Sequence, residues 1–396
     1  MVAKYFQPGN VRGMWRPTRP IWQYIVVWAV ICLVFLYELD LFKENLEREP
    51  AQQQWTVDLQ AGCPVGDAAP SSDSNTDAKL ARPLSAAELL CRPLPTDRST
   101  IPKLLHQSWK THELPTKFKK WSTVCREKHE DWEWVLWSND DNLNLVKKFF
   151  PWLEETYLAL PGDIFRADFS RNLYMYIFGG VYVDLDTDCL RTTTSVFDAY
   201  DVPHPENLTV GTDDDGNINQ FAAFGRMGDD DNFSNSIPNA WMTSSPGHPF
   251  FLMPLLSVQR KVEDSKSFLY WVFHRVSAEN WTGPAALFDA IRDFTKNGLS
   301  KKAAALAAAG PFAQLPKETK QEIVLLPEHW VYPYNWRSDE MRPLCSVELK
   351  TFDPKACQAK LEVAEKGSIS ITYWSHTHSG TSDHAKNIDR ISHRDG

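Results

Sequence analysis

The segment from residue 162 to residue 191 constrains the fold more than any other part of the chain. Asp163 is a favourable N-cap residue, and no Gly or Pro follows Gly162 until Gly179, which predicts a helix. Gly179-Gly180 predicts the end of that helix, because glycine tolerates the positive φ of a helix C-terminus. Residues 181–183, Val-Tyr-Val, then have the β-branched and aromatic composition of a short buried strand.

An acidic run, Asp184-Leu185-Asp186-Thr187-Asp188, follows this predicted strand directly. Three carboxylates at alternate positions of an extended chain would all point to one side. Such crowding is unfavourable unless a cation neutralises it. Hard carboxylate oxygens suit Mg²⁺, Mn²⁺ or Ca²⁺ rather than Zn²⁺, and α/β folds bind ligands where their strands end. The run therefore predicts a divalent-cation site, and a solvated acidic loop is the alternative.

The same segment resembles the core of glycosyltransferase family 32, which is typified by fungal Golgi mannosyltransferases. The family signature is Asp-x-x-Arg on a helix and then Gly-Gly-[Ile or Val]-Tyr-x-Asp-x-Asp, matched here by Asp168, Arg171, Gly179, Gly180, Tyr182, Asp184 and Asp186. The resemblance implies that Asp184 and Asp186 are the catalytic carboxylates. Asp186 would be the main metal ligand, and Asp184 would contact the metal or the donor's ribose. Asp168, Arg171 and Tyr182 would bind the nucleotide-sugar donor.

Further stretches extend the resemblance from about residue 101 to the C-terminus. Residues 101–109 match the family opening Ile-Pro-x-x-[Ile or Leu]-His-Gln-x-Trp, which implies donor-site roles for His106 and Gln107. A buried core histidine is the alternative for His106. Asn239 lies in a stretch that resembles the family's Asn-x-x-[Met or Ile] segment, and would line the donor or acceptor pocket.

Near the C-terminus, family members carry a histidine that closes the metal and diphosphate site. His376 and His378 are the corresponding candidates for a metal ligand in this chain. The family's histidine is often followed by Ser-Trp, whereas Thr381-Ser382 stands here, so the third metal ligand is left open between the two histidines.

The order of predicted elements between residues 101 and 188 is strand, helix, strand, helix, helix and strand. The helices are expected at 118–128, 143–160 and 163–178, and the middle strand at 132–137. This order predicts an α/β layer with a parallel sheet. Because the acidic run ends the last strand, the predicted fold class is α/β: a GT-A-type nucleotide-diphospho-sugar transferase fold, with one N-terminal transmembrane helix.

An apolar run at residues 21–37 is interrupted only by Gln23, and its length is near the lower limit for spanning a bilayer. Basic residues precede it and acidic residues follow it, which places the N-terminus in the cytoplasm. The predicted organisation is a cytoplasmic tail at 1–20, a transmembrane anchor at 21–38, a stem at 39–99 and a lumenal catalytic domain at 100–396. A cleaved signal peptide is the alternative for the apolar run.

Seven cysteines are present, and Cys32 lies within the predicted span, which leaves six for the lumenal side. An oxidising compartment would allow these to pair. Cys345 and Cys357 are the expected pair, whereas Cys189 is either paired or a packed free thiol beside the site. The net charge of −9 and the absence of a basic tract argue against nucleic acid as a partner.

Together these features predict a metal-dependent retaining glycosyltransferase of the Golgi membrane, a single-pass type II protein with Mn²⁺ as the expected cation. The resemblance implies GDP-mannose as donor, and as acceptor either an N-glycan or the sphingolipid inositol phosphorylceramide. The alternative is a non-catalytic sugar-binding membrane protein of the same fold. A glycoside hydrolase also uses two carboxylates but needs no metal-like Asp cluster, so it fits the acidic run less well.

Overall fold

A computed structural model describes residues 26, 28–32, 63, 80–202, 204–205, 219–230, 233–267, 270, 276–313, 320–347 and 349–375. The chain divides into two units, Met1–Gln52 and Gln53–Gly396. The described residues of the first unit are helical. Most of the predicted anchor at 21–38 lies outside the described residues, and no helix within them is long and apolar enough to cross a membrane.

A seven-stranded mixed sheet forms the centre of the second unit, in the order β1-β3-β2-β4-β7-β6-β8. Its strands are β1 (Arg82–Pro83), β2 (Leu104–Ser108), β3 (Glu133–Trp137), β4 (Gly180–Val183), β6 (Asn219–Gly225), β7 (Trp241–Ser244) and β8 (Lys320–Leu326). The pairs β1–β3, β3–β2 and β2–β4 are parallel, which confirms the predicted α/β layer. β7 runs antiparallel to both β4 and β6, so the carboxyl end of β4 and the start of β7 share one edge.

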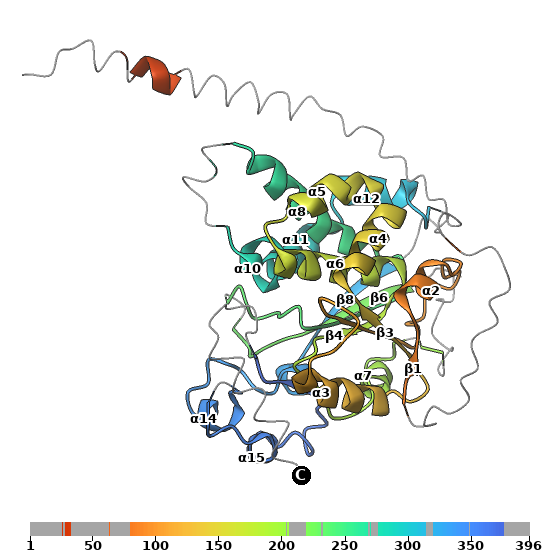
Figure 1. Cartoon of the computed structure of the whole chain (residues 1–396), viewed down its shortest axis with the longest axis vertical. Helices are drawn as coiled ribbons and strands as arrows, with labels where there is room; N and C mark the ends of the chain where they lie inside the picture. Colours follow the sequence, from red (N-terminus) through yellow and green to blue (C-terminus); the bar gives the residue numbers. More distant parts are fainter. Residues whose placement is uncertain are drawn as a thin grey trace, which may run out of the picture. The chain divides into compact units, whose positions relative to one another are not determined.

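Helices cover both faces of this sheet (Figure 1). One core cluster packs on the face covered by α2 (Ala86–Leu90), α4 (Asn139–Phe149), α5 (Glu154–Ala159), α6 (Asp163–Ile177), α8 (Leu252–Asp264), α10 (Ala278–Trp281), α11 (Pro284–Asn297) and α12 (Lys301–Ala309). A second cluster packs under α3 (Thr116–Glu127), α7 (Thr194–Ala199), α13 (Glu328–Val331), α14 (Arg342–Cys345) and α15 (Pro354–Lys360). The short 3-10 turns are η1 (Pro151–Leu153) and η3 (Pro249–Phe251).

A separate two-stranded ribbon joins the acidic run to the C-terminal part of the chain. It pairs β5 (Thr187–Cys189) with β9 (Ser370–Thr372) in antiparallel fashion. Three disulfides link Cys63 to Cys91, Cys125 to Cys189, and Cys345 to Cys357. The predicted Cys345–Cys357 pair is confirmed, and Cys189 is not a free thiol.

Helix α6 is more deeply buried than its sequence pattern predicts. Gly162 is its N-cap, without a side-chain hydrogen bond, so Asp163 is the first helical residue rather than the cap. Every residue from Asp168 to Ile177 is buried, including charged and amide side chains that the pattern would leave at the surface. Gly179 and Gly180 then adopt φ of +65° and +87°, as the predicted break requires.

The folded sheet also includes residues that were expected to belong to the stem. β1 pairs with β3, and α2 carries buried Ala86, Leu89 and Leu90. Ser85 caps α2 by accepting a hydrogen bond from Glu88 N at 3.1 Å. The packed unit therefore begins about twenty residues before the predicted boundary at residue 100.

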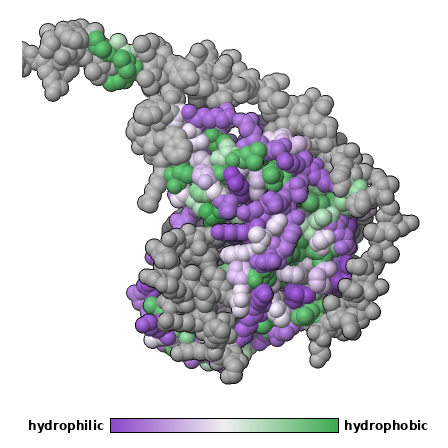
Figure 2. Space-filling model, in the orientation of Figure 1, coloured by the Kyte–Doolittle hydropathy of each residue, from purple (hydrophilic) through white to green (hydrophobic). Residues whose placement is uncertain are grey.

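On the face drawn in Figure 2, hydrophilic and hydrophobic residues are mixed over the described surface. Among the described residues of the second unit, the large apolar side chains that are exposed are Leu158, Leu325 and Leu349. The other large apolar side chains are mostly withdrawn into the two clusters that sandwich the sheet, as expected for a packed α/β domain.

Replacement of Gly180 by Ala should destabilise the sheet. The added Cβ would lie 2.4 Å from the carbonyl oxygen of Leu104 on β2, at a φ of +87°. Gly298→Ala is the matched control, because Gly298 has φ +73° with no atom within 4 Å of the added Cβ. Urea unfolding should show a loss of about 1–2 kcal/mol for Gly298→Ala. The loss for Gly180→Ala should exceed that by about 2 kcal/mol or more, and equal losses would contradict the close packing of β4 on β2.

Candidate active site

A cavity of about 930 Å³ opens where β2 and β4 end and β7 begins. The sheet contributes its floor, through Tyr182, Asp184 and Asp186 after β4, and through Asn239 before β7. The remaining walls come from the first turns of α6, from residues 276–280 around α10, and from the aromatic residues Trp109, Phe118, Trp336 and Trp374. The site therefore lies at the edge of the sheet where the acidic run was expected to bind its ligand.

A buried ion cluster centred on Arg171 connects α6 with the acidic run. Arg171 Nη2 lies 2.9 Å from Asp184 Oδ1, and Nη1 lies 3.2 Å from Asp168 Oδ1. Nη1 also donates to the carbonyl oxygen of Asn239 at 2.8 Å. Burial alone would lower the pKa of Arg171, but the neighbouring carboxylates raise it, so the guanidinium remains charged. Since it is committed to these oxygens, Arg171 positions Asp184 within the site.

Asp184 is held from a second side by Tyr182. The Tyr182 hydroxyl donates to Asp184 Oδ1 at 2.6 Å, and burial keeps the pKa of this tyrosine well above its usual value. Ser108 Oγ lies 3.2 Å from the same hydroxyl, and donates to it because the tyrosine proton is directed at Asp184. Burial raises the pKa of Asp184 to about 7, an effect opposed by Arg171 and reinforced by Asp186.

Asp186 is held by the C-terminal segment instead. Its Oδ2 accepts two hydrogen bonds of 2.9 Å, from the backbone N–H and from the hydroxyl of Ser375. The residue before Ser375, Trp374, has a φ of +53°, which is strained for a bulky side chain. Its indole N–H donates to the carbonyl of Tyr334 at 3.1 Å, which helps to maintain this conformation.

Asp188 does not share the cavity with Asp184 and Asp186, so the expectation of three carboxylates on one side is wrong. The chain turns after β4, with Thr187 N donating to Asp184 O at 3.1 Å, and this turn breaks the alternation of an extended strand. Asp188 Oδ2 instead accepts a hydrogen bond from Gln358 Nε2 at 2.9 Å. Burial raises the pKa of Asp188 to about 6.

The chemistry of Asp184 and Asp186 fits a divalent cation. Each uses one carboxylate oxygen for the contacts above, and its other oxygen has no partner in the described structure. Five acidic residues line the cavity (Asp163, Asp168, Asp184, Asp186 and Glu279) against two basic ones (Lys110 and Arg171). A diphosphate would be repelled from this surface without a cation. Mg²⁺-type ions are commonly held by two carboxylates together with phosphate oxygens and water.

The described residues contain no group of three His, Cys, Asp or Glu side chains that could hold a metal ion. His376 and His378 lie outside the described residues. The two free carboxylate oxygens are thus the protein ligands that the described part of the site offers.

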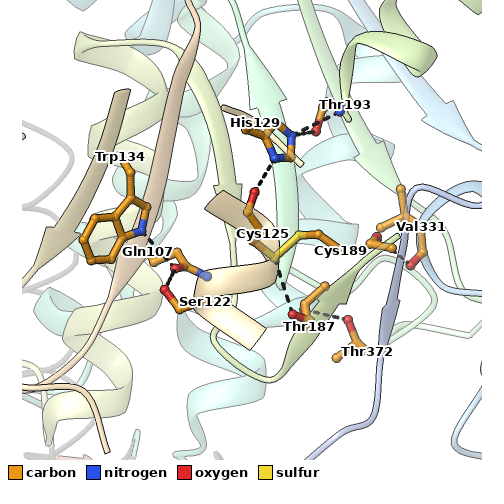
Figure 3. Close-up of a disulfide and its surroundings, with 11 residues drawn as sticks. Gln107, Ser122, Cys125, His129, Trp134, Thr187, Cys189, Thr193, Val331 and Thr372 are labelled. Carbon is orange, nitrogen blue, oxygen red and sulfur yellow. Dashed lines mark hydrogen bonds between the residues drawn. A yellow bond between two sulfur atoms is a disulfide. The ribbon is translucent and has the colours of Figure 1, made fainter. Parts of the chain in front are cut away.

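His106 and Gln107 are buried in the sheet and do not line the cavity. Trp137 Nε1–H donates to His106 Nδ1 at 3.0 Å, so the ring proton is on Nε2 and is donated to Gly179 O at 2.9 Å. Burial lowers the pKa of His106 to about 4, and the ring is neutral. Gln107 Oε1 accepts from Ser122 Oγ at 2.6 Å and from Trp134 Nε1 at 3.0 Å (Figure 3). In this structure both side chains brace β2.

Asn239 lines the cavity, and its buried Nδ2 has no hydrogen-bond partner in the described structure. Asp168, Arg171, Tyr182, Asp184 and Asp186 line it too, so among the described residues that were expected at the site, only His106 and Gln107 do not line the cavity. Sequence reasoning missed Ser375. This residue lies next to the candidate His376, but no local pattern marks it as part of the site.

Comparisons with known proteins bear on the same segment. Residues 115–203 match a family model described as a glycosyltransferase sugar-binding region containing the DXD motif. This match covers the segment that carries the resemblance to glycosyltransferase family 32 and supports that resemblance. The DXD motif in this chain is Asp184-Leu185-Asp186.

Several curated relatives in yeasts match parts of this chain. Inositol phosphoceramide mannosyltransferase 3 of Schizosaccharomyces pombe is 30% identical over 41% of this chain and 38% of its own length. Mannosyl phosphorylinositol ceramide synthase SUR1 of Saccharomyces cerevisiae is 28% identical over 59% of this chain and 49% of its own length. The initiation-specific alpha-1,6-mannosyltransferase of S. cerevisiae is 26% identical over 25% of this chain and 22% of its own length. The chain thus matches less than half of the length of each of these relatives.

The raised pKa of Asp184 predicts a pH-dependent difference between the protein and its Asp184→Asn variant. Because the folded-state pKa of about 7 lies above the unfolded value near 3.8, folding favours the protonated carboxyl. The stability that Asp184 contributes is therefore present below about pH 4 and is lost as the pH rises toward 7. Urea unfolding is measured for both proteins with a chelator present. As the pH rises from about 4 to 7, the free energy of unfolding of the wild type should fall relative to that of Asp184→Asn. Parallel pH profiles would contradict this electrostatic environment.

Proposed function

We propose that this protein is a metal-dependent retaining glycosyltransferase that transfers mannose from GDP-mannose to a glycan or glycolipid acceptor. The observation that carries the proposal is the pair of free carboxylate oxygens of Asp184 and Asp186 in a cavity with an excess of negative charge. The family match and the mannosyltransferase names of the relatives support the class of reaction.

A divalent cation held by Asp184 and Asp186 would neutralise the diphosphate leaving group as the glycosidic bond breaks. The chain's own contribution is to hold these carboxylates rigidly. Arg171 and Tyr182 orient Asp184, and Ser375 orients Asp186. The unpaired Nδ2 of Asn239 provides a hydrogen-bond donor at the cavity wall for a hydroxyl group of the donor. Mn²⁺ is the cation that we propose.

The aromatic side of the cavity suits the planar and apolar parts of the substrates. Trp109 and Phe118 form one edge-to-face pair with ring centroids 5.2 Å apart, and Trp336 and Trp374 form another at 5.2 Å. Aromatic faces stack against nucleobases and against the apolar faces of sugars. We therefore assign substrate contacts to these two pairs, which line the same cavity as the carboxylates.

For the acceptor, we propose inositol phosphorylceramide or an N-glycan. Two of the relatives above are named for mannosylation of inositol phosphoceramide, and they match larger shares of this chain than does the alpha-1,6-mannosyltransferase. The inositol phosphorylceramide acceptor is therefore the first to test. Retention of the donor's alpha configuration follows from the family resemblance, and no side chain is assigned as a catalytic base.

We also propose a GT-A-type arrangement and a Golgi membrane location, with the catalytic domain in the lumen. The parallel strands β3, β2 and β4, with the DXD motif after β4, support the first. The three disulfides support the lumenal location, because disulfides form in an oxidising compartment. The proposed order remains a tail at 1–20, an anchor at 21–38, a stem and a catalytic domain, which now includes residues 80–99.

The proposed reaction is tested by release of nucleotide from the purified protein. GDP-mannose, UDP-glucose, UDP-galactose and UDP-N-acetylglucosamine are offered separately, each with Mn²⁺ or with chelator. We expect turnover of GDP-mannose with Mn²⁺ and none with chelator, followed by sugar transfer to inositol phosphorylceramide or to an N-glycan. Failure of the folded protein to bind any of these donors would overturn the proposal and favour a non-catalytic member of the family.

Asp186→Asn should reduce the rate of Mn²⁺-dependent nucleotide release by about 100-fold or more. The reason is that loss of a metal ligand removes several kcal/mol of transition-state stabilisation. Asp188→Asn is the matched control from the same acidic run. Asp188 bonds to Gln358 and does not line the cavity, so its variant should keep most of the activity. Equal losses in the two variants would show that the motif acts through folding rather than through the cation.

A further inference from the structure

The DXD carboxylates lie on a segment with little regular structure of its own. β4 ends at Val183, a turn follows, and β5 contains three residues. A two-stranded ribbon as short as β5–β9 is marginally stable by itself. The position of Asp186 must therefore depend on contacts between this segment and the rest of the fold.

The Cys125–Cys189 disulfide ties this segment to α3, three residues after Asp186 (Figure 3). Helix α3 is itself well anchored. Its Phe118, Trp121 and Cys125 are buried, and its Ser122 hydroxyl donates to Gln107 of the central strand β2 at 2.6 Å. The disulfide thus connects the metal-binding segment covalently to a helix that is fixed on the sheet, across 64 residues of sequence.

A histidine just after α3 reinforces the same connection. Thr193 N–H donates to His129 Nε2 at 3.1 Å, so His129 carries its proton on Nδ1 and donates it to the carbonyl of Cys125 at 2.7 Å (Figure 3). His129 is buried, and burial lowers its pKa to about 4, so it remains neutral. The segment after the DXD motif is therefore held to the end of α3 at two points, Cys189 and Thr193.

The position of β5 also governs the contact between Ser375 and Asp186. Thr187 lies opposite Thr372 in the ribbon, with their hydroxyl oxygens 2.9 Å apart. Three residues beyond Thr372, Ser375 reaches Asp186 Oδ2 at 2.9 Å through the strained Trp374. A shift of β5 would therefore disturb its pairing with β9, and with that pairing the contact between Ser375 and Asp186.

We propose that the Cys125–Cys189 disulfide is a positioning element of the DXD site: it holds Asp186 where it binds the divalent cation, so that its loss weakens cation binding while the fold persists. This rests on the cation site of the proposed function. Cys125 and Cys189 do not line the cavity, and they act on the cation through β5 and Asp186.

The test compares two double variants of the full chain, Cys125→Ala/Cys189→Ala and Cys63→Ala/Cys91→Ala. The second removes a disulfide that joins residue 63 to the end of α2 and does not line the cavity. Mn²⁺ affinity is measured from the electron paramagnetic resonance signal of free Mn²⁺, and folding from near-ultraviolet circular dichroism. We expect about tenfold weaker Mn²⁺ binding for Cys125→Ala/Cys189→Ala, the loss typical of removing support around a metal ligand. The Cys63→Ala/Cys91→Ala variant should bind Mn²⁺ as the wild type does.

Unchanged Mn²⁺ affinity in folded Cys125→Ala/Cys189→Ala would overturn the inference, and so would equal weakening in both variants. If this variant does not fold, the wild type is reduced stepwise instead, with thiols counted by alkylation. Mn²⁺ affinity should then fall when Cys125 and Cys189 become free, before the near-ultraviolet signal changes, and reoxidation should restore it. Simultaneous loss of both signals would show that the disulfide holds the whole fold. Failure of the wild type to bind Mn²⁺ would instead count against the proposed function.

Discussion

The buried charge of Arg171 is the interaction on which the rest of the site depends. It joins α6 to the end of β4 through Asp184, and to the start of β7 through the carbonyl of Asn239. A buried charge is unfavourable unless it is paired and hydrogen-bonded, and Arg171 is paired with Asp168 and Asp184. Removal of Arg171 would leave the buried carboxylates of Asp168 and Asp184 without their counter-charge, which explains why polar residues occupy the middle of the buried helix α6.

The cluster also separates the roles of the two motif carboxylates. Asp184 is oriented by groups on α6 and β4, close to it in the fold, whereas Asp186 is oriented by Ser375 from the far end of the described chain. The two carboxylates each keep one oxygen free, and both residues line the cavity. A rigid pair of hard ligands would suit a divalent cation, since ligands that are already ordered lose little entropy on binding.

Long-range contacts supply the rigidity that the acidic segment lacks locally. The Cys125–Cys189 disulfide, the β5–β9 pairing and the Ser375 hydrogen bonds each join residues that are far apart in sequence. The entropic cost of closing these long loops is offset only when the whole domain folds. The geometry of the proposed cation site is therefore a property of the complete α/β unit. The proposed transfer reaction would use this arrangement to place a charged leaving group in an otherwise repulsive cavity.

Local sequence patterns predicted the helix, the glycine break, the buried strand and the acidic run, because propensity and periodicity act within a single element. They also predicted that the first strands run parallel, since the alternation of strands and helices restricts the possible topologies. They could not decide which carboxylates face the cavity: the turn after Val183 directs Asp188 to Gln358 instead. The pairing of Cys125 with Cys189, the contact of Ser375 with Asp186 and the packing role of His106 were decided by tertiary structure. The physical reason is that each of these joins segments whose approach is set by the packing of α3, β4 and β9, which no local pattern encodes.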